Sequence, residues 1–207
     1  DRISTLYRQR EMTAPAVTGA VVALVQQKRG NYLLFFPSYK YMLMIHDAFK
    51  ADRPDIDTIL QTREMGEPER IAFLSKFSLD QPDTLVGFAV MGGIFGEGID
   101  LVGDRLNAAA IVGVGLPGIS LELELIREYF SQSHNAGFEF AYLYPGINRV
   151  LQAAGRVIRS ENERGVVLLI DQRFGTHRYR SLLPREWKPI RVHNEQQLQQ
   201  YLRSFWG

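Results

Sequence analysis

The chain has 207 residues, of which 45% are hydrophobic and 23% are charged, as in an ordinary globular domain. Its net charge of +1 provides no overall field to attract nucleic acid, so any basic site must be a local groove. The absence of cysteine excludes disulfides and thiolate-held zinc or iron–sulfur sites within the chain. The four histidines are far apart and show no metal-ligand spacing, which predicts no metal site.

No apolar run approaches the roughly 20 residues of a membrane span, and no signal peptide is recognisable, so no membrane contact is predicted. The sequence opens with "DRIST" and has no initiator methionine. We therefore expect it to be part of a longer protein.

The first half of the chain alternates between helical and strand patterns. Gly30 is expected to cap the first helix in a left-handed conformation, Ser38 to cap the second, and Pro68 to lie in the first turn of the third. The pattern predicts, in order, a helix over 16–28, a strand over 31–36, a helix over 39–49, a strand over 57–62 and a helix over 67–77.

The second half continues this alternation. The pattern predicts a strand over 84–90, a glycine-rich segment "MGGIFGEGIDLVG" over 91–103, a strand over 108–117, a helix over 121–133, a helix that begins at Pro145 and a strand over 166–171. Apolar strands separated by helices predict an α/β fold, with a mostly parallel sheet and helices on both faces. We expect one domain, 1–207, with 1–15 and 185–207 as peripheral appendages.

The stretch "QAAGRVIRS" from Gln152 to Ser160 divides into two faces when it is placed on a helix. Gln152, Arg156 and Arg159 share one side, and aliphatic residues occupy the other. Gly155 lowers helix stability by about 1 kcal/mol relative to alanine and leaves room beside the arginines. Since guanidinium forks suit phosphate oxygens, this face is a candidate anion site; the alternative is a merely solvated face.

Ligands in such folds bind beyond the carboxyl ends of the strands. Ser38 and Tyr39, the glycine-rich segment with Glu97 and Asp100, and Asp171 are all predicted there. The glycine-rich segment is either a long turn or a loop whose backbone approaches a ligand. Asp171 either caps the chain that follows its strand or takes part in such a site.

Two motifs of a complete ATPase are missing from the sequence. No glycine precedes a lysine, which excludes a phosphate loop, and no Asp-Glu dipeptide occurs to bind magnesium beside one. A face suited to phosphate without a triphosphate cradle indicates half of a site, completed by another domain.

Three stretches resemble, in chain order, motifs of superfamily 2 DNA helicases of the XPD/DinG branch. "LLFFPSYKYM" resembles motif IV, "GGIFGEGIDLVGDRLNAAAIVGVGLP" resembles motif V, and "QAAGRVIRS" with "ERGVVLLIDQRF" resembles motif VI and its strand. The resemblance runs from about residue 20 to residue 174. It implies the second RecA-like motor domain of such a helicase.

The resemblance also implies roles at the nucleotide. Arg159 would be the arginine finger on the γ-phosphate, Arg156 a second phosphate contact, and Gln152 a neighbour of the nucleotide and the attacking water. Asp100 would reach the ribose or an interdomain partner.

Glu97 and Gly98 would shape the glycine-rich loop, and Ser38 and Tyr39 would touch the DNA backbone. The implied cofactors are ATP and Mg, bound mainly by the first motor domain, with an iron–sulfur cluster also allowed upstream of this chain. The implied partners are single-stranded DNA, travelled 5′ to 3′, and the first motor domain of the same polypeptide. The implied location is the bacterial cytoplasm, at the nucleoid.

Two alternatives remain open at this point. A RecA-like domain kept for regulation or protein contact would retain the sheet without the role of the arginines. Half of a nucleotide-sugar transferase would also be doubly wound, but it calls for a deep pocket with a substrate-binding acid, for which the sequence shows no pattern.

Overall fold

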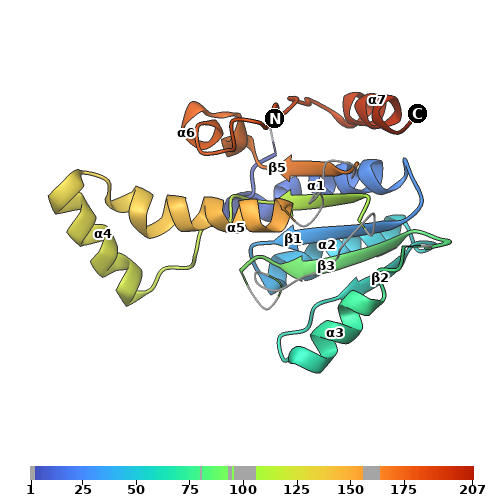
Figure 1. Ribbon diagram of the computed structural model, residues 1–207, viewed down its shortest axis with the longest axis horizontal. Helices are drawn as coiled ribbons and strands as arrows, with labels where there is room; N and C mark the ends of the chain where they lie inside the picture. Colours follow the sequence, from blue (N-terminus) through green and yellow to red (C-terminus); the bar gives the residue numbers. More distant parts are fainter. Residues whose placement is uncertain (1–2, 80, 93–94, 96–105, 156–163) are drawn as a thin grey trace.

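The computed structural model describes residues 3–79, 81–92, 95, 106–155 and 164–207. Five parallel strands form one sheet in the order β2-β3-β1-β4-β5 (Figure 1). The strands are β1 (Asn31–Phe36), β2 (Asp57–Leu60), β3 (Leu85–Val90), β4 (Ala108–Val112) and β5 (Val166–Ile170). The predicted α/β class with a parallel sheet and helices on both faces is confirmed.

Helices precede β1, follow β5 and lie in three of the four connections between strands in the described part of the chain, as parallel crossovers require. They are η1 (Tyr7–Gln9), α1 (Arg10–Val25), α2 (Tyr39–Asp52), α3 (Glu67–Ser75), α4 (Leu121–His134), the π-helix η2 (Glu139–Leu143), α5 (Tyr144–Ala154), η3 (Gln172–Gly175), α6 (His177–Arg180) and α7 (Glu195–Trp206). The predicted helix and strand order is confirmed, with boundaries shifted by a few residues.

The central strand β1 is buried along its whole length and pairs with β3 on one side and β4 on the other. Its side chains alternate between two cores. Tyr32, Leu34 and Phe36 face the core covered by α1, α2 and α7. Leu33 and Phe35 face the core covered by α3 and α5. The sheet therefore buries both faces, which explains why its strands read as continuous apolar runs.

The local signals at helix ends are partly confirmed. Ser38 caps α2 by accepting a hydrogen bond from the Tyr41 amide, and Pro68 lies in the first turn of α3. The cap predicted at Gly30 is wrong, because α1 ends at Val25, the last α1 residue to face the core. Gly30 has φ of 132°, outside the left-handed helical region, and an added Cβ there would lie 2.5 Å from Asn107 Nδ2.

Both terminal segments contribute to the packed domain. Ser4 and Thr5 are buried ahead of α1, and Leu198 and Leu202 of α7 belong to the core that α1 covers. No sequence pattern signals this packing, because residues 1–15 and 185–207 are rich in polar side chains. Thr5 and Thr13 in the first segment are hydrogen-bonded within the fold.

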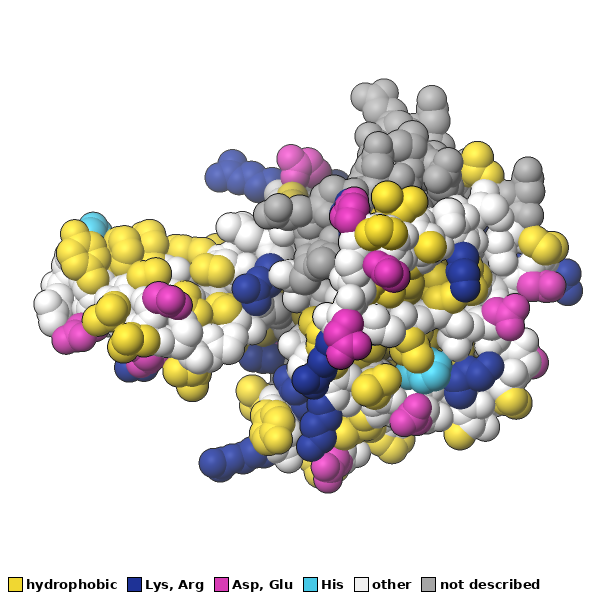
Figure 2. All heavy atoms as spheres, turned by 90° about the horizontal axis from the view of Figure 1, so that it is seen from below, with side chains coloured by type: hydrophobic (Ala, Val, Ile, Leu, Met, Phe, Trp, Pro, Cys, Tyr) yellow, Lys and Arg dark blue, Asp and Glu magenta, His cyan; other side chains and the backbone are white. Residues whose placement is uncertain are grey.

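An arm built from α4, η2 and the start of α5 projects beyond the sheet (Figure 1). Figure 2 shows hydrophobic side chains gathered on it. Leu121, Leu125 and Tyr129 form an exposed stripe at intervals of four residues on α4. Within the described ranges, no helix is both long and apolar enough to cross a membrane.

A glycine in β3 gives a direct test of the core. An added Cβ at Gly87 would lie 2.6 Å from Phe77 Cζ and 3.0 Å from Leu33 Cδ1. We expect Gly87→Ala to lower the free energy of unfolding by about 1–3 kcal/mol through overpacking, measured by urea denaturation. Gly118→Ala, where nothing lies within 4 Å of the new Cβ, is the matched control and should change little. Equal effects at both glycines would contradict this packing.

Candidate functional site

The carboxyl ends of the parallel strands lie at one edge of the sheet, where such folds bind ligands. Ser38 follows β1, Gly92 follows β3, Gly113 follows β4 and Asp171 follows β5. An added Cβ at Gly113, whose φ is 93°, would lie 3.1 Å from Thr5 Oγ1 and 3.7 Å from Pro37 Cγ. The loops after β1 and β4 therefore meet the N-terminal segment at this edge.

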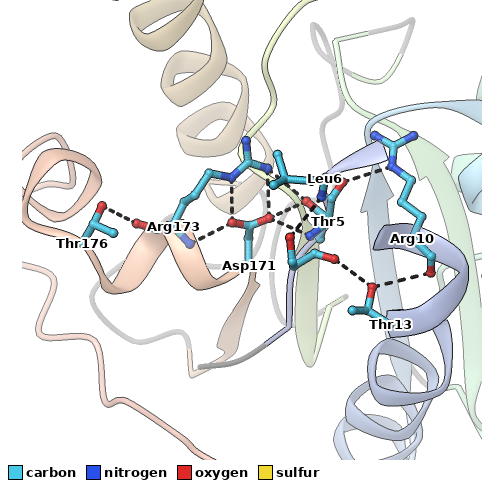
Figure 3. Close-up of polar contacts among 8 residues, drawn as sticks. Thr5, Leu6, Arg10, Thr13, Asp171, Arg173 and Thr176 are labelled. Carbon is cyan, nitrogen blue, oxygen red and sulfur yellow. Dashed lines mark hydrogen bonds and ion pairs between the residues drawn. The ribbon is translucent and has the colours of Figure 1, made fainter. Parts of the chain in front are cut away.

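Asp171 organises the polar contacts at this edge (Figure 3). Its side chain is fully buried and pairs with Arg173, whose Nε and Nη2 lie 2.8 and 2.9 Å from its two oxygens. The backbone amides of Arg173 and Thr5 also donate to it, at 2.8 and 3.1 Å, as does the Thr5 hydroxyl. The carboxylate thus fastens the N-terminal segment to the end of β5.

These contacts set the charge of the Asp171 carboxyl group. Burial alone would raise its pKa, but the hydrogen bonds from Arg173 and Thr5, with the nearby positive charge of Arg173, lower the net pKa below its ordinary value. Asp171 therefore stays ionised at neutral pH. Its role in the structure is that of a cap for the chain after β5, one of the two roles that the sequence left open.

Ser38 and Tyr39 lie side by side at the N-terminus of α2, and internal contacts hold both. Ser38 Oγ accepts from the Tyr41 amide and from Arg10 Nη1, each at 3.4 Å. Tyr39 Oη accepts from Gln61 Nε2 at 2.7 Å and donates to the Thr62 carbonyl at 3.1 Å. Both side chains are partly exposed. Their proposed contact with DNA stays a prediction.

Helix α5 places its polar side next to the loops that follow β3 and β4. Ile147 and Val150 are buried in the core, whereas Gln152 is exposed. Arg149 Nη1 donates to the Gly115 carbonyl at 3.4 Å, and an added Cβ at Gly92 would lie 2.7 Å from Arg149 Nε. The beginning of the glycine-rich segment therefore touches the polar side of α5.

The remaining predicted site residues lie outside the described residues: Arg156, Arg159, Glu97, Gly98 and Asp100. The helix that was predicted to carry the arginines ends, as described, at Ala154 with Gly155 as its C-cap. Of the eight predicted residues the structure thus locates Gln152, Ser38 and Tyr39.

Sequence reasoning missed three residues that hold this edge together. Thr5 and Arg10 lie in the segment that was expected to be peripheral, and Gln61 follows β2. Gln61 is buried, and its Oε1 accepts from the Val90 amide at 2.7 Å, which ties the end of β3 to Tyr39. All three residues contact partners that are distant in the sequence, and no local sequence pattern signals such contacts.

A cavity of 1040 Å³ lies beside β5 and the chain that leads into α7. Ile3, Leu168 and Trp187 contribute to its lining; Ser38, Tyr39 and Gln152 are not among the described residues that do. In the part of the chain that the structure describes, no three His, Cys, Asp or Glu side chains are grouped so that they could hold a metal ion.

Comparison with known proteins agrees with the fold and the motifs. The model of the helicase C-terminal domain family matches residues 21–190, and the chain belongs to this family. Two solved structures, named XPD_APO and XPD_Helicase, superpose with TM-scores of 0.69 and 0.70, each over 87% of this chain, at 22% identity. The superposed part covers 36% of the first solved chain and 32% of the second, and it supports the RecA-like fold.

Curated relatives carry helicase names. ATP-dependent DNA helicase CHL1 of Debaryomyces hansenii is 25% identical over 79% of this chain and 22% of its own length. ATP-dependent DNA helicase DinG of Photobacterium profundum is 30% identical over 71% of this chain and 21% of its own length. The predicted resemblance to the XPD/DinG branch is confirmed. The chain spans about a fifth of the length of these relatives.

The Asp171 pair predicts an acid-sensitive contribution to stability. Asp171→Asn leaves Arg173 without its counter-charge, and we expect it to lower the free energy of unfolding by about 3 kcal/mol at pH 7. This is the low end of the range for buried ion pairs, because the Arg173 side chain is 22% exposed. A carboxyl group whose pKa is lower in the folded protein than in the unfolded protein stabilises the fold at pH values above its unfolded-state pKa. This contribution is lost as the pH falls through the folded-state pKa. The difference in the free energy of unfolding between wild type and variant should therefore become smaller below about pH 4.

Urea denaturation at a series of pH values measures that gap. Asp55→Asn is the control, because Asp55 also pairs with an arginine, Arg53, but is exposed. It should leave the unfolding transition unchanged. A gap for Asp171→Asn that is independent of pH would contradict the role given to its charge.

Proposed function

We propose that this chain is the second motor domain of an ATP-dependent DNA helicase, and that it completes an ATP site begun by a first motor domain of the same polypeptide. The family match and the helicase names of the relatives support this proposal. The sequence motifs indicate that the ATP site is shared with another domain, because the chain has a phosphate-binding pattern but no phosphate loop of its own.

The observation that carries the proposal is the contact between α5 and the loop after β3. Arg149 touches the backbone at Gly92, and the exposed Gln152 lies about one helical turn further along α5. The starts of two motifs, at Gly92 and Gln152, more than 50 residues apart in the sequence, thus lie near each other. In a motor domain, these are the segments from which the nucleotide contacts come.

The donor set fits a nucleotide phosphate. An exposed glutamine amide on a helix that leads into Arg156 and Arg159 offers neutral and charged donors, and arginine contacts phosphate oxygens bidentately. We assign Arg159 to neutralise the charge that develops on the γ-phosphate, Arg156 to a second phosphate oxygen and Gln152 to orienting the attacking water. Mg would be held mainly by the first motor domain.

The other predicted residues take supporting roles in this proposal. Asp100 reaches the ribose or the facing domain, and Glu97 and Gly98 shape the loop that carries it. Ser38 and Tyr39 contact the backbone of single-stranded DNA at the N-terminus of α2, where free amide groups favour phosphate. Closure of the two motor domains on ATP then moves the DNA strand.

The 207-residue chain alone should neither hydrolyse ATP nor unwind DNA, because it lacks the phosphate loop and the acidic motif. A phosphate-release assay with single-stranded DNA measures this, with the full-length protein as positive control. DNA-stimulated hydrolysis clearly above a blank would show that the chain is a complete enzyme and not half of one.

In the full-length protein, Arg159→Ala should reduce DNA-stimulated hydrolysis by roughly 10³-fold, the scale of arginine fingers. ATP affinity should fall much less, because the finger acts mainly on the transition state. Arg159→Lys should restore little activity, since lysine lacks the planar fork.

Turnover, nucleotide affinity and melting temperature are measured together for these variants. The control is Arg164→Ala, a nearby exposed arginine that donates to the Phe205 carbonyl. It should keep hydrolysis near the wild-type rate. Near-wild-type hydrolysis by Arg159→Ala would instead favour the alternative of a RecA-like domain with no catalytic arginine.

A further inference from the structure

Arg10 at the start of α1 is held in place without a carboxylate partner among the described residues. Its Nε donates to the Thr5 carbonyl at 3.1 Å, and its Nη1 lies 3.4 Å from Ser38 Oγ. Its guanidinium carbon lies 4.7 Å from the centre of the Tyr41 ring. None of the ion pairs among the described residues involves Arg10.

The charge of Arg10 is not balanced by a carboxylate among the described residues around it. The nearest buried carboxylate, Asp171, is already bound by Arg173 and Thr5. Burial lowers the pKa of Arg10, and the charge of Arg173 acts in the same direction. A half-buried guanidinium without a counter-ion is costly unless an anion neutralises it. In this fold the anion has to come from outside the described residues.

A pocket of 290 Å³ opens beside Arg10. Arg8 and Lys40, both exposed, contribute two further cations to its lining, and Glu11 contributes one carboxylate. The pocket lies next to Ser38, where the free amides at the N-terminus of α2, a helix of 14 residues, add positive potential. The balance of charge at the pocket therefore favours an anionic ligand.

Tyr7 gives the pocket an aromatic side. Its ring is 73% exposed, and the Arg10 guanidinium carbon lies 5.6 Å from the ring centre. Aromatic side chains beside cations are the usual means of binding single-stranded nucleic acid, because the cations meet the phosphates and a base stacks on the ring. Inorganic phosphate would use the cations but not Tyr7.

We propose that Tyr7, Arg8, Arg10 and Lys40 form a binding site for single-stranded DNA, in which the three cations contact successive phosphates and Tyr7 stacks on a base. The site rests on the proposed helicase function and extends the DNA contact surface from Ser38 and Tyr39 to the N-terminal segment. Thr5 and Asp171 position it, because they fix the segment that carries Tyr7 and Arg8.

The test uses the full-length protein and a labelled oligo-dT, with affinity measured across a range of salt concentrations. Arg8→Ala with Lys40→Ala removes two exposed cations and spares Arg10, which also holds Ser38. We expect about tenfold weaker binding at low salt and a fall of about 1.4 in the slope of log affinity against log salt. Tyr7→Ala should weaken oligo-dT binding while the salt slope stays the same.

The control is Lys76→Ala with Arg185→Ala, which removes the same two charges from exposed positions elsewhere in the chain. Melting temperatures check that every variant is folded. If the Arg8/Lys40 double variant binds as tightly as the control, or loses affinity with an unchanged salt slope, the site is refuted although the helicase function stands. If the wild-type protein binds no oligo-dT, the proposed function fails as well. Competition by inorganic phosphate that is equally strong for wild type and for Tyr7→Ala, with equal oligo-dT affinity in both, would mean that Tyr7 stacks on no base and that the pocket recognises phosphate alone, which would refute the proposed site.

Discussion

The rest of this structure depends on burial of the central strand β1 from both sides. All six of its residues are buried, with side chains alternating between two separate cores. A strand in that position needs helices on both faces, and helical crossovers make its neighbours parallel. Polar groups cannot lie within the layers, so they collect where the strands end. The location of any ligand site follows from this constraint.

The edge that results is held together by a buried charge. Asp171 binds Arg173 and Thr5, and Thr5 lies 166 positions away in the sequence. Arg10 in turn donates to the Thr5 carbonyl and to Ser38 Oγ. The N-terminal segment thereby contacts this edge. The fold and the proposed DNA surface share this network, so a change in Asp171 affects both stability and the placement of Tyr7 and Arg8.

The fold followed from the sequence because its strands are short apolar runs separated by amphipathic segments, with a clear cap at Ser38 and a first-turn proline at Pro68. Gly30 misled the prediction, because its positive φ serves a close approach to Asn107 and not a helix end. The roles of Thr5, Arg10 and Gln61 were not predictable, since each depends on a partner brought close only by the tertiary fold. Gln152 was predictable, because its exposure follows from helical periodicity.

We infer that α5 and the segment after it complete an ATP site across a domain interface. The most direct measurement is an experimental structure of the full-length protein with single-stranded DNA, ADP and aluminium fluoride, which imitates the phosphoryl group in flight. We expect the Arg159 guanidinium within hydrogen-bond distance of the fluoride and Gln152 facing the same nucleotide. A structure in which the two motor domains enclose the nucleotide while Arg159 points into solvent would contradict it.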